Sequence, residues 1–538
     1  MIDGGEVDRA TGYTGIGAGI GQDDRARRRW LVPLLCGLAL LLPLLVTPVL
    51  PLIDYYNHIA RYFVLSHVDG DPALAANYVK AWALLPNLGL DVLATPLLAV
   101  VPPLLAAKLI LGAILLIEFT GVLFLASALN RRPGALTSLL LLGLLYSFIL
   151  NWGFSNFLLG LGLVFWTLGL WVRLRSRPLL ATLVCSVAAL GIFFCHGFAF
   201  ALYGMLLGAM ELGRLLERRS LTDPVLVVKT GALLAIQAVL PALLFLQTST
   251  SRVSGGATAG GIEKHLKNGS LSGRLASEFW YRLETIMRVA ESPYPVLDIL
   301  TFCLLVGLVA WALWRGHMRL HIWLVPAVLL FGLLCIVTPP SLFGVGYVSD
   351  RIPLVLALVV VAGLSITRPR SREARLILAV VALVGVVRIG AMMTGWAGYT
   401  GQFARFQAVT AVVPRGALLA DVPIYGTKRR DNYLPRCSMY RPLLLPLRGV
   451  MVPLFAFESQ QPLRLTGKLA EAQAARVEAI IPHAKGERGY DDDQVAAIAR
   501  AGLFRYIFMC GRDQLTRPLP ANVRVVSESG NMAVLRIN

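Results

Sequence analysis

Residues 104–129 read LLAAKLILGAILLIEFTGVLFLASAL, and this stretch decides the class of fold. A membrane-spanning helix needs roughly 20 consecutive, predominantly apolar residues, and this run exceeds that length. Glu118 lies near its middle, where a charged side chain costs roughly 2.5–3.5 kcal/mol on insertion scales. We therefore expect residues 104–129 to cross a membrane, with Glu118 facing the inside of a helix bundle.

The composition extends this conclusion to the whole chain. Of 538 residues, 56% are hydrophobic and only 15% are charged, which is typical of a polytopic membrane protein. The formal net charge is +19, but most arginines lie in short clusters between apolar runs. Such clusters mark cytoplasmic loops, so the basic excess indicates topology and not nucleic-acid binding.

The apolar runs predict an α-helical polytopic membrane protein with about 11 transmembrane helices. The predicted spans are 30–50, 104–129, 134–150, 157–172, 179–195, 197–213, 225–247, 296–314, 321–338, 353–366 and 376–394. Residues 84–101 are also apolar, but they carry several prolines and Asp91. Counting them as a span would expose every later arginine cluster, so we expect an interfacial or re-entrant helix there.

The arginine clusters predict the orientation, because they occupy every second junction. They comprise Arg25 to Arg29, Arg131 and Arg132, Arg173 to Arg177, Arg214 to Arg219, Arg315 and Arg319, and Arg368 to Arg375. The positive-inside rule places these junctions in the cytoplasm. We therefore expect a multi-pass protein of a bacterial inner membrane. Residues 1–29 are a disordered cytoplasmic N-terminus, and 30–394 form a bundle with outer loops 51–103 and 248–295.

Residues 395–538 lose the long apolar runs and predict a small exported α/β domain. Strands are expected at 417–422, 450–457, 505–509, 523–527 and 532–537, with a helix at 492–501. Glu528 to Asn531 give a hairpin signal between the last two strands. Export would permit a disulfide between Cys437 and Cys510 without requiring one.

The second outer loop has two parts. Residues 248–273 are rich in Ser, Thr and Gly and predict a flexible segment. Residues 274–290 have helical periodicity, with Trp280 and Tyr281 suited to a headgroup layer, and predict an amphipathic helix on the membrane. Two roles stay open for it: packing over the bundle, or gating a lipid-linked substrate.

Polar chemistry concentrates on the outer face, above all in Asp54-Tyr55-Tyr56-Asn57-His58, with Arg61 one turn after Asn57. Sugar transfer from a lipid phosphate needs a proton acceptor, such as a carboxylate, and cations or donors for the leaving phosphate. Asp54 is the candidate catalytic residue. The candidate substrate-binding residues are His58, Arg61, Asn151, Asn156, His196 and Arg351, and the candidate second acids are Asp69, Asp71 and Asp91.

Several of these candidates also have a structural alternative. Asp54 could be the N-cap of the following helix. Asp69 and Asp71 flank Gly70, and this Asp-Gly-Asp sequence is typical of a turn. Asp350 and Arg351 could pair with each other, and His58 could be a structural interfacial histidine. The cysteines show no metal-ligand spacing, so no cofactor is assigned, and a requirement for a divalent metal stays open.

This arrangement resembles the GT-C glycosyltransferases, including bacterial mannosyltransferase-like and aminoarabinose-transferase-like members. The resemblance rests on an acidic residue in the first outer loop, ten or more spans, interfacial helices in that loop and an exported C-terminal α/β domain. In that family the first-loop acid is the catalytic carboxylate, and Asp54 is the matching position; many members follow it with Glu, where this chain has Tyr55.

The motifs Asp-Tyr-x-Asn-His-x-x-Arg and Asn-Trp-Gly-Phe-x-Asn-Phe are also similar to a set of uncharacterised bacterial membrane proteins near this superfamily. The resemblance implies a polyprenyl-phosphate sugar donor and a glycan, lipid or protein acceptor in the cell envelope. A transporter or flippase, and a non-catalytic accessory protein of envelope polysaccharide assembly, are the alternatives.

Overall fold

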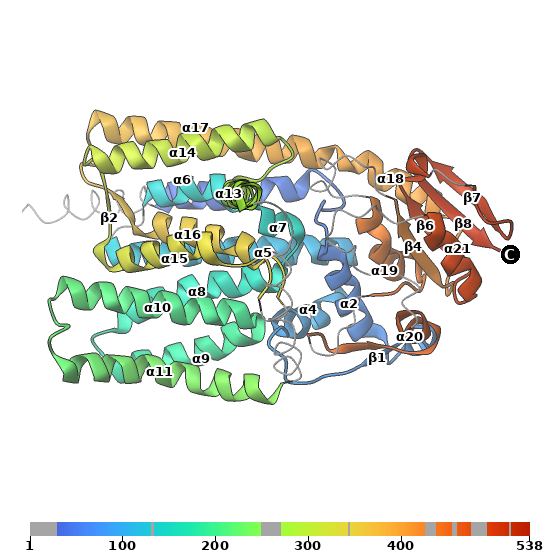
Figure 1. Ribbon diagram of the computed structural model, residues 1–538, viewed down its shortest axis with the longest axis horizontal. Coiled ribbons are helices and arrows are strands. Elements are labelled where there is room, and N and C mark those ends of the chain that lie inside the picture. Colours follow the sequence, from blue (N-terminus) through green and yellow to red (C-terminus); the bar gives the residue numbers. More distant parts are fainter. Residues whose placement is uncertain are drawn as a thin grey trace, which may run out of the picture.

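The protein is mostly helical, and its long helices pack side by side in a bundle. The C-terminal domain lies beyond one end of this bundle (Figure 1). This computed structural model describes residues 30–130, 134–248, 271–342, 345–424, 437–454, 460–474, 492–515 and 518–538. The predictions for 1–29, for Arg131 and Arg132, and for most of 248–273 lie outside the described residues.

Within those described ranges, seven helices are long and apolar enough to cross a membrane. They are α5 (Pro103–Asn130), α8 (Ser155–Leu174), α9 (Pro178–Cys195), α10 (Gly197–Glu217), α11 (Pro224–Gln247), α14 (Pro295–Trp314) and Arg372–Thr410, which comprises α17 (Arg372–Ala397) and α18 (Tyr399–Thr410). A helical membrane protein is thereby confirmed, and so is the helix predicted at 104–129.

The other predicted spans form shorter helices, so the predicted number of eleven transmembrane helices is not confirmed. The shorter apolar helices are Trp30–Leu45, which ends in η1 (Leu42–Leu45), α4 (Gly89–Val100), α6 (Ala135–Leu144) and Ile322–Val337, which comprises η3 (Ile322–Leu324) and α15 (Val325–Val337). The run at 353–366 belongs to α16 (Val348–Gly363), which gives way to β3 (Leu364–Ile366), paired antiparallel with β2 (Met318–Leu320).

Close backbone contact between α5 and α8 holds the centre of the bundle. A Cβ added to Gly121 would lie 2.5 Å from the carbonyl oxygen of Gly162, so neither helix has room for a larger residue there. Small residues allow this approach between membrane helices, where packing replaces the hydrophobic effect. Glu118 lies on the same face of α5 and is buried, as the sequence predicts.

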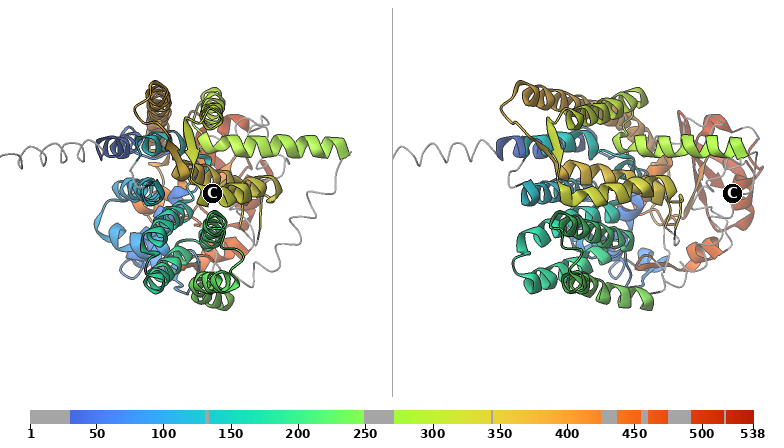
Figure 2. Two further views of the ribbon diagram at one scale, coloured as in Figure 1. Left: turned by 90° about the vertical axis from the view of Figure 1, so that its left-hand side faces the viewer. Right: turned by 60° about the vertical axis from the view of Figure 1, so that its left-hand side comes forward.

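Several shorter helices gather at the end of the bundle nearest the C-terminal domain (Figure 1). They include α2 (Tyr55–His67), α4 and α7 (Phe148–Trp152). The predicted amphipathic helix is α13 (Leu271–Met287). It is seen end-on in Figure 1 and lengthwise in Figure 2, where it lies across the direction of the bundle and extends beyond it.

The C-terminal domain contains a four-stranded sheet in the order β4-β6-β8-β7. Its strands are β4 (Leu419–Pro423), β6 (Tyr506–Cys510), β7 (Val523–Ser529) and β8 (Met532–Ile537). The helix predicted at 492–501 is α21 (Asp492–Ala501), and β7 and β8 form the predicted antiparallel hairpin. The shorter elements of the chain are α3 (Pro72–Ala75), η2 (Arg288–Ala290), η5 (Cys437–Leu443), α19 (Leu444–Arg448), α20 (Gly467–Ala474) and η6 (Arg512–Gln514).

The strand predicted at 450–457 is wrong for residues 450–454, which make only an isolated bridge between Met451 and Leu418. Pro453 has no backbone N–H and cannot continue a ladder. The N–H of Val452 is used elsewhere, because it donates to the hydroxyl of Tyr78 at 3.2 Å. Residues 455–459 lie outside the described residues.

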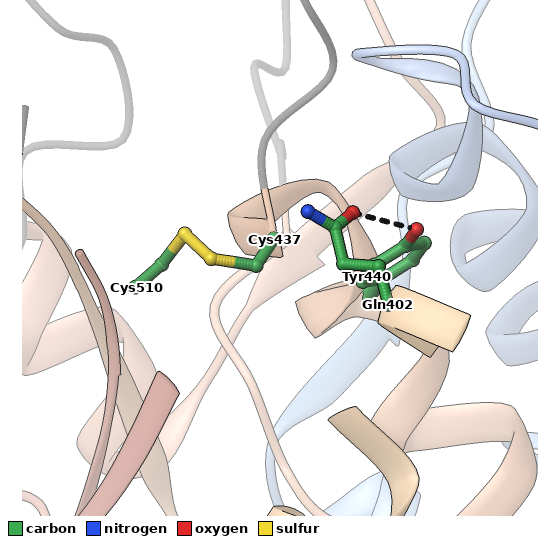
Figure 3. Close-up of a disulfide and its surroundings, with 4 residues drawn as sticks. All are labelled: Gln402, Cys437, Tyr440 and Cys510. Carbon is green, nitrogen blue, oxygen red and sulfur yellow. Dashed lines mark hydrogen bonds between the residues drawn. A yellow bond between two sulfur atoms is a disulfide. The ribbon is translucent and has the colours of Figure 1, made fainter. Parts of the chain in front are cut away.

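The first outer loop and the C-terminal domain are joined to each other. Within that loop, β1 (Tyr78–Lys80) pairs antiparallel with β5 (Leu463–Leu465). The pairing of Cys437 with Cys510 is present and ties η5 to β6 (Figure 3). On the other side of η5, the Tyr440 hydroxyl donates to Gln402 in α18 at 2.9 Å. The disulfide and this hydrogen bond together hold η5 between β6 and α18.

Candidate functional site

Asp54 occupies the N-cap position of α2, but its side chain does not cap the helix. Its carboxylate instead accepts a hydrogen bond from Asn57 Nδ2 at 3.1 Å and lies 3.3 Å from His58 Nε2. The alternative of a capping carboxylate is therefore wrong. The side chain keeps 19% of its surface exposed, so this carboxylate is both oriented by neighbours and accessible to a second molecule.

His58 connects Asp54 to a buried ion pair. Its Nδ1 lies 2.9 Å from Arg61 Nη2, and because a guanidinium only donates, this nitrogen must accept. A neutral His58 then carries its proton on Nε2, which faces Asp54. Arg61 thus sets the tautomer of His58, and His58 in turn orients the Asp54 carboxylate.

Arg61 and Asp91 form a buried ion pair at the end of the contacts that run from Asp54 through His58 to Arg61. Arg61 Nε donates to Asp91 Oδ1 at 2.6 Å and Nη2 donates to Oδ2 at 3.2 Å, with both side chains 0% exposed. This bidentate pair locks α2 to α4. It corrects two assignments: Arg61 is not placed to bind substrate, and Asp91 is not placed as a second acid, because each is committed to the other.

A tight turn places an aromatic cluster beside Asp54. The backbone N–H of Asp54 donates to the carbonyl of Trp152 at 2.9 Å. Gly153 follows with φ +86°, and a Cβ there would lie 2.7 Å from the backbone nitrogen of Tyr55. Only glycine fits this conformation and this approach. The turn carries Trp152 and Phe154, whose rings stack at 5.8 Å between centroids.

The same aromatic cluster reaches Arg351 in α16. The Arg351 guanidinium lies 4.6 Å from the ring centroid of Phe154 and 4.7 Å from that of Phe157, both within cation–π range. Its Nη1 lies 3.2 Å from His196 Nε2. Phe154 therefore links the turn that holds Asp54 to the Arg351–His196 pair, which the sequence separates by 155 residues.

The alternative in which Asp350 neutralises Arg351 is wrong. Asp350 forms its ion pair with Arg288 at 3.2 Å. Arg351 is 4% exposed, and no carboxylate in the described part of the chain forms an ion pair with it. Burying an uncompensated charge is unfavourable by several kcal/mol even after relaxation, on the order of 3–5 kcal/mol in measured cases.

Asn151 and Asn156 position the site instead of facing it. Asn156 Oδ1 accepts from the N–H of Leu90 at 2.9 Å, which satisfies a backbone donor in the first turn of α4. Its Nδ2 donates to the carbonyl of Asn87 at 3.3 Å. Asn151 donates to Glu291 at 3.4 Å. Their predicted role in binding substrate is replaced by one in holding α4 and the residues before α14.

Asp69 and Asp71 lie in contacts of their own. Asp69 pairs with Lys80 in an exposed contact at 2.5 Å. Asp71 caps α3 by accepting from the N–H of Ala73 at 2.9 Å and lies 3.5 Å from Arg415, which agrees with the turn alternative. Among the described residues, no group of three or more His, Cys, Asp or Glu side chains is arranged to hold a metal.

The sequence did not single out Glu291, which lies partly buried beside Asn151 and Arg288. Burial raises the pKa of Glu291 to about 7, against the opposing influence of Arg288 and the hydrogen bond from Asn151. The sequence does not predict this position of Glu291, because Glu291 lies far from Asp54 along the chain. The aromatic contacts of Trp152 were equally hidden, because periodicity identifies an apolar face and not its partner.

In comparisons with known proteins, no family model matches the chain and no curated protein matches it.

Proposed function

We propose that the protein is a membrane glycosyltransferase that moves a sugar from a polyprenyl-phosphate donor to an envelope glycan, lipid or protein on the outer face of the membrane. In this reaction the acceptor oxygen bonds to the anomeric carbon of the sugar. The bond between that carbon and the phosphate oxygen breaks, and polyprenyl phosphate leaves. The proton of the acceptor hydroxyl goes to Asp54.

The geometry around Asp54 is the observation that carries this proposal. A proton acceptor must be held in place and remain reachable, and Asp54 meets both needs. Asn57 and His58 orient its carboxylate, and Arg61 fixes the tautomer of His58. A carboxylate with only a structural role would be expected to cap α2, which Asp54 does not do.

The surroundings of Asp54 support a lipid-borne donor. Asp54 is the N-cap residue of α2, and α2 lies at the end of the bundle that faces the C-terminal domain (Figure 1). A donor whose tail lies in the bilayer would present its phosphate at that level. The joined first loop and C-terminal domain provide a non-membrane surface next to the same end, suited to an acceptor.

Transfer by membranes that contain the protein tests this function. Membranes would receive isotope-labelled polyprenyl-phosphate hexose or pentose, and label would be followed into glycan, lipid and protein fractions. The matched variants are Asp54→Asn and Asp69→Asn, which make the same chemical change at the site and at an exposed ion pair. Transfer should require Asp54 and tolerate the change at Asp69. Equal transfer by both variants at equal expression would refute the role of Asp54.

A further inference from the structure

Arg351 is a buried cation, and no carboxylate among the described residues forms an ion pair with it. It is 4% exposed, its Nε has no hydrogen-bond partner, and the adjacent carboxylate of Asp350 is bound to Arg288. By contrast, Arg61 and Arg388, the other deeply buried arginines of the described bundle, pair with Asp91 and Asp298. Among these three buried arginines of the described bundle, Arg351 is thus the one without an ion-pair partner.

His196 adds a second donor at the same point. It lies between α9 and α10, where its Nδ1 accepts from the N–H of Phe198 at 3.2 Å. Burial and the neighbouring Arg351 charge hold the pKa of His196 well below its usual range, which keeps the ring neutral. With Nδ1 accepting, the single ring proton sits on Nε2 and points at Arg351 Nη1, 3.2 Å away.

Two hydrogen-bond donors therefore face each other without an acceptor between them. Such a contact is unfavourable, and both donors are relieved when one anionic oxygen accepts from each. The adjoining surface is aromatic, because Arg351 stacks against Phe154, Phe157 and Phe198. Phe154, Phe198 and His196 are only partly buried, so a ligand would reach the pair from the side that these residues line.

We propose that Arg351 and His196 bind the phosphate group of an isoprenyl-phosphate lipid. This assignment rests on the proposed function and names the residues that would hold its leaving group. One phosphate oxygen accepts from Arg351 Nη1 and His196 Nε2, and the negative charge balances the guanidinium. The phenylalanine rings contact the first part of the apolar chain.

Helix α13 gives such a lipid a route to this pair. Tyr281 in α13 hydrogen-bonds Ser349 at 2.7 Å, and Arg288 just beyond its end pairs with Asp350. Both contacts fall on the residues directly before Arg351. The exposed aromatic side chains Phe279 (61%) and Trp280 (64%) lie on the helix that crosses the bundle direction and extends past it (Figure 2). A lipid headgroup layer suits these side chains.

Direct binding to the purified full-length protein in lipid nanodiscs tests the assignment. Farnesyl phosphate is the probe, farnesol lacks the phosphate, inorganic phosphate lacks the chain, and nanodiscs without protein give the background. Wild type should bind farnesyl phosphate and not farnesol. Arg351→Gln should weaken binding by about tenfold or more, as expected for loss of a charge-assisted contact. Arg319→Gln, the same change at an exposed arginine, should leave binding unchanged.

A second variant keeps the test valid if Arg351→Gln folds poorly. His196→Glu brings a carboxylate to Arg351, so it should preserve or raise the Tm without ligand while abolishing binding. Unchanged binding by both folded variants would overturn the assignment. Inorganic phosphate binding as tightly as farnesyl phosphate would overturn the lipid source. Binding that depends on Arg351 in a protein without sugar transfer would sustain the anion site and refute the proposed function.

Discussion

Replacing Asp91 by asparagine removes the carboxylate that forms an ion pair with Arg61. The pair is bidentate at 2.6 and 3.2 Å, with both side chains 0% exposed. Removing one partner of a buried ion pair costs about 3–5 kcal/mol, because the other charge stays buried and unpaired. At about 1.4 kcal/mol for each factor of ten, the unfolding equilibrium constant should rise roughly 10²- to 10⁴-fold.

The free energy of unfolding of the purified protein in mixed detergent micelles measures this effect. Asp69→Asn is the matched control, because the exposed Asp69–Lys80 pair should contribute about 0–1 kcal/mol. The double variant Arg61→Met/Asp91→Leu should recover most of the loss, since apolar replacements of buried pairs are often neutral or stabilising. Loss of less than about 1 kcal/mol in Asp91→Asn would refute the reasoning that this pair locks α2 to α4.

Three further predictions concern other parts of the site and its supports. The folded-state pKa of Glu291 is raised from 4.5 to about 7, so its contribution is full below pH 4.5 and is lost as pH rises through about 7. Thermal unfolding of wild type should therefore show lower stability at pH 7.5 than at pH 5, by up to about 2.4 kcal/mol, and Glu291→Gln should remove this dependence. Cys437→Ala should destabilise the C-terminal domain by about 4 kcal/mol, because the bond spans 73 residues; a denaturant titration that matches wild type would contradict this. Gly153→Ala should destabilise the protein by at least about 1 kcal/mol through its positive φ, measured by the shift in Tm, and an unchanged Tm would argue against the close approach to Tyr55.

The sequence predicts the helices of this fold well where apolar runs are long. Residues 104–129 exceed the thickness of a bilayer and become α5 almost to the residue. Shorter runs are ambiguous, because 353–366 contains enough apolar residues for a helix but ends as strand β3, whose partner β2 comes from a loop far earlier in the chain. Local pattern carries no information about such a partner.

The C-terminal domain shows the same division between local and distant determinants. The hairpin of β7 and β8 follows from a turn signal between alternating residues, and the structure has it. The pairing of β1 with β5 joins Tyr78 to Leu465. No periodicity within either short segment specifies the other, so the attachment of the domain to the first outer loop required the structure.

At the candidate site, the position of Asp54 at the end of an apolar run made it a candidate from the sequence alone. The roles of the other polar residues depend on tertiary contacts. A polar cluster at the end of an apolar run is unusual, and this identified the carboxylate. Whether a neighbouring polar side chain faces a ligand or a protein partner depends on contacts between distant segments. Arg61 pairs with Asp91, 30 residues away, whereas Arg351 forms no ion pair with a carboxylate among the described residues. The sequence does not distinguish the two arginines, and both are buried. They differ in whether a carboxylate pairs with them.

Measuring sugar transfer and lipid binding on the same preparation of Asp54→Asn tests whether Asp54 performs chemistry or merely holds substrate. Farnesyl phosphate binding should stay within about twofold of wild type, since the phosphate site does not include Asp54. Sugar transfer from the polyprenyl-phosphate donor should fall by about 10²- to 10⁴-fold, the usual contribution of a general base. Transfer at the wild-type rate with unchanged binding would contradict a chemical role for Asp54.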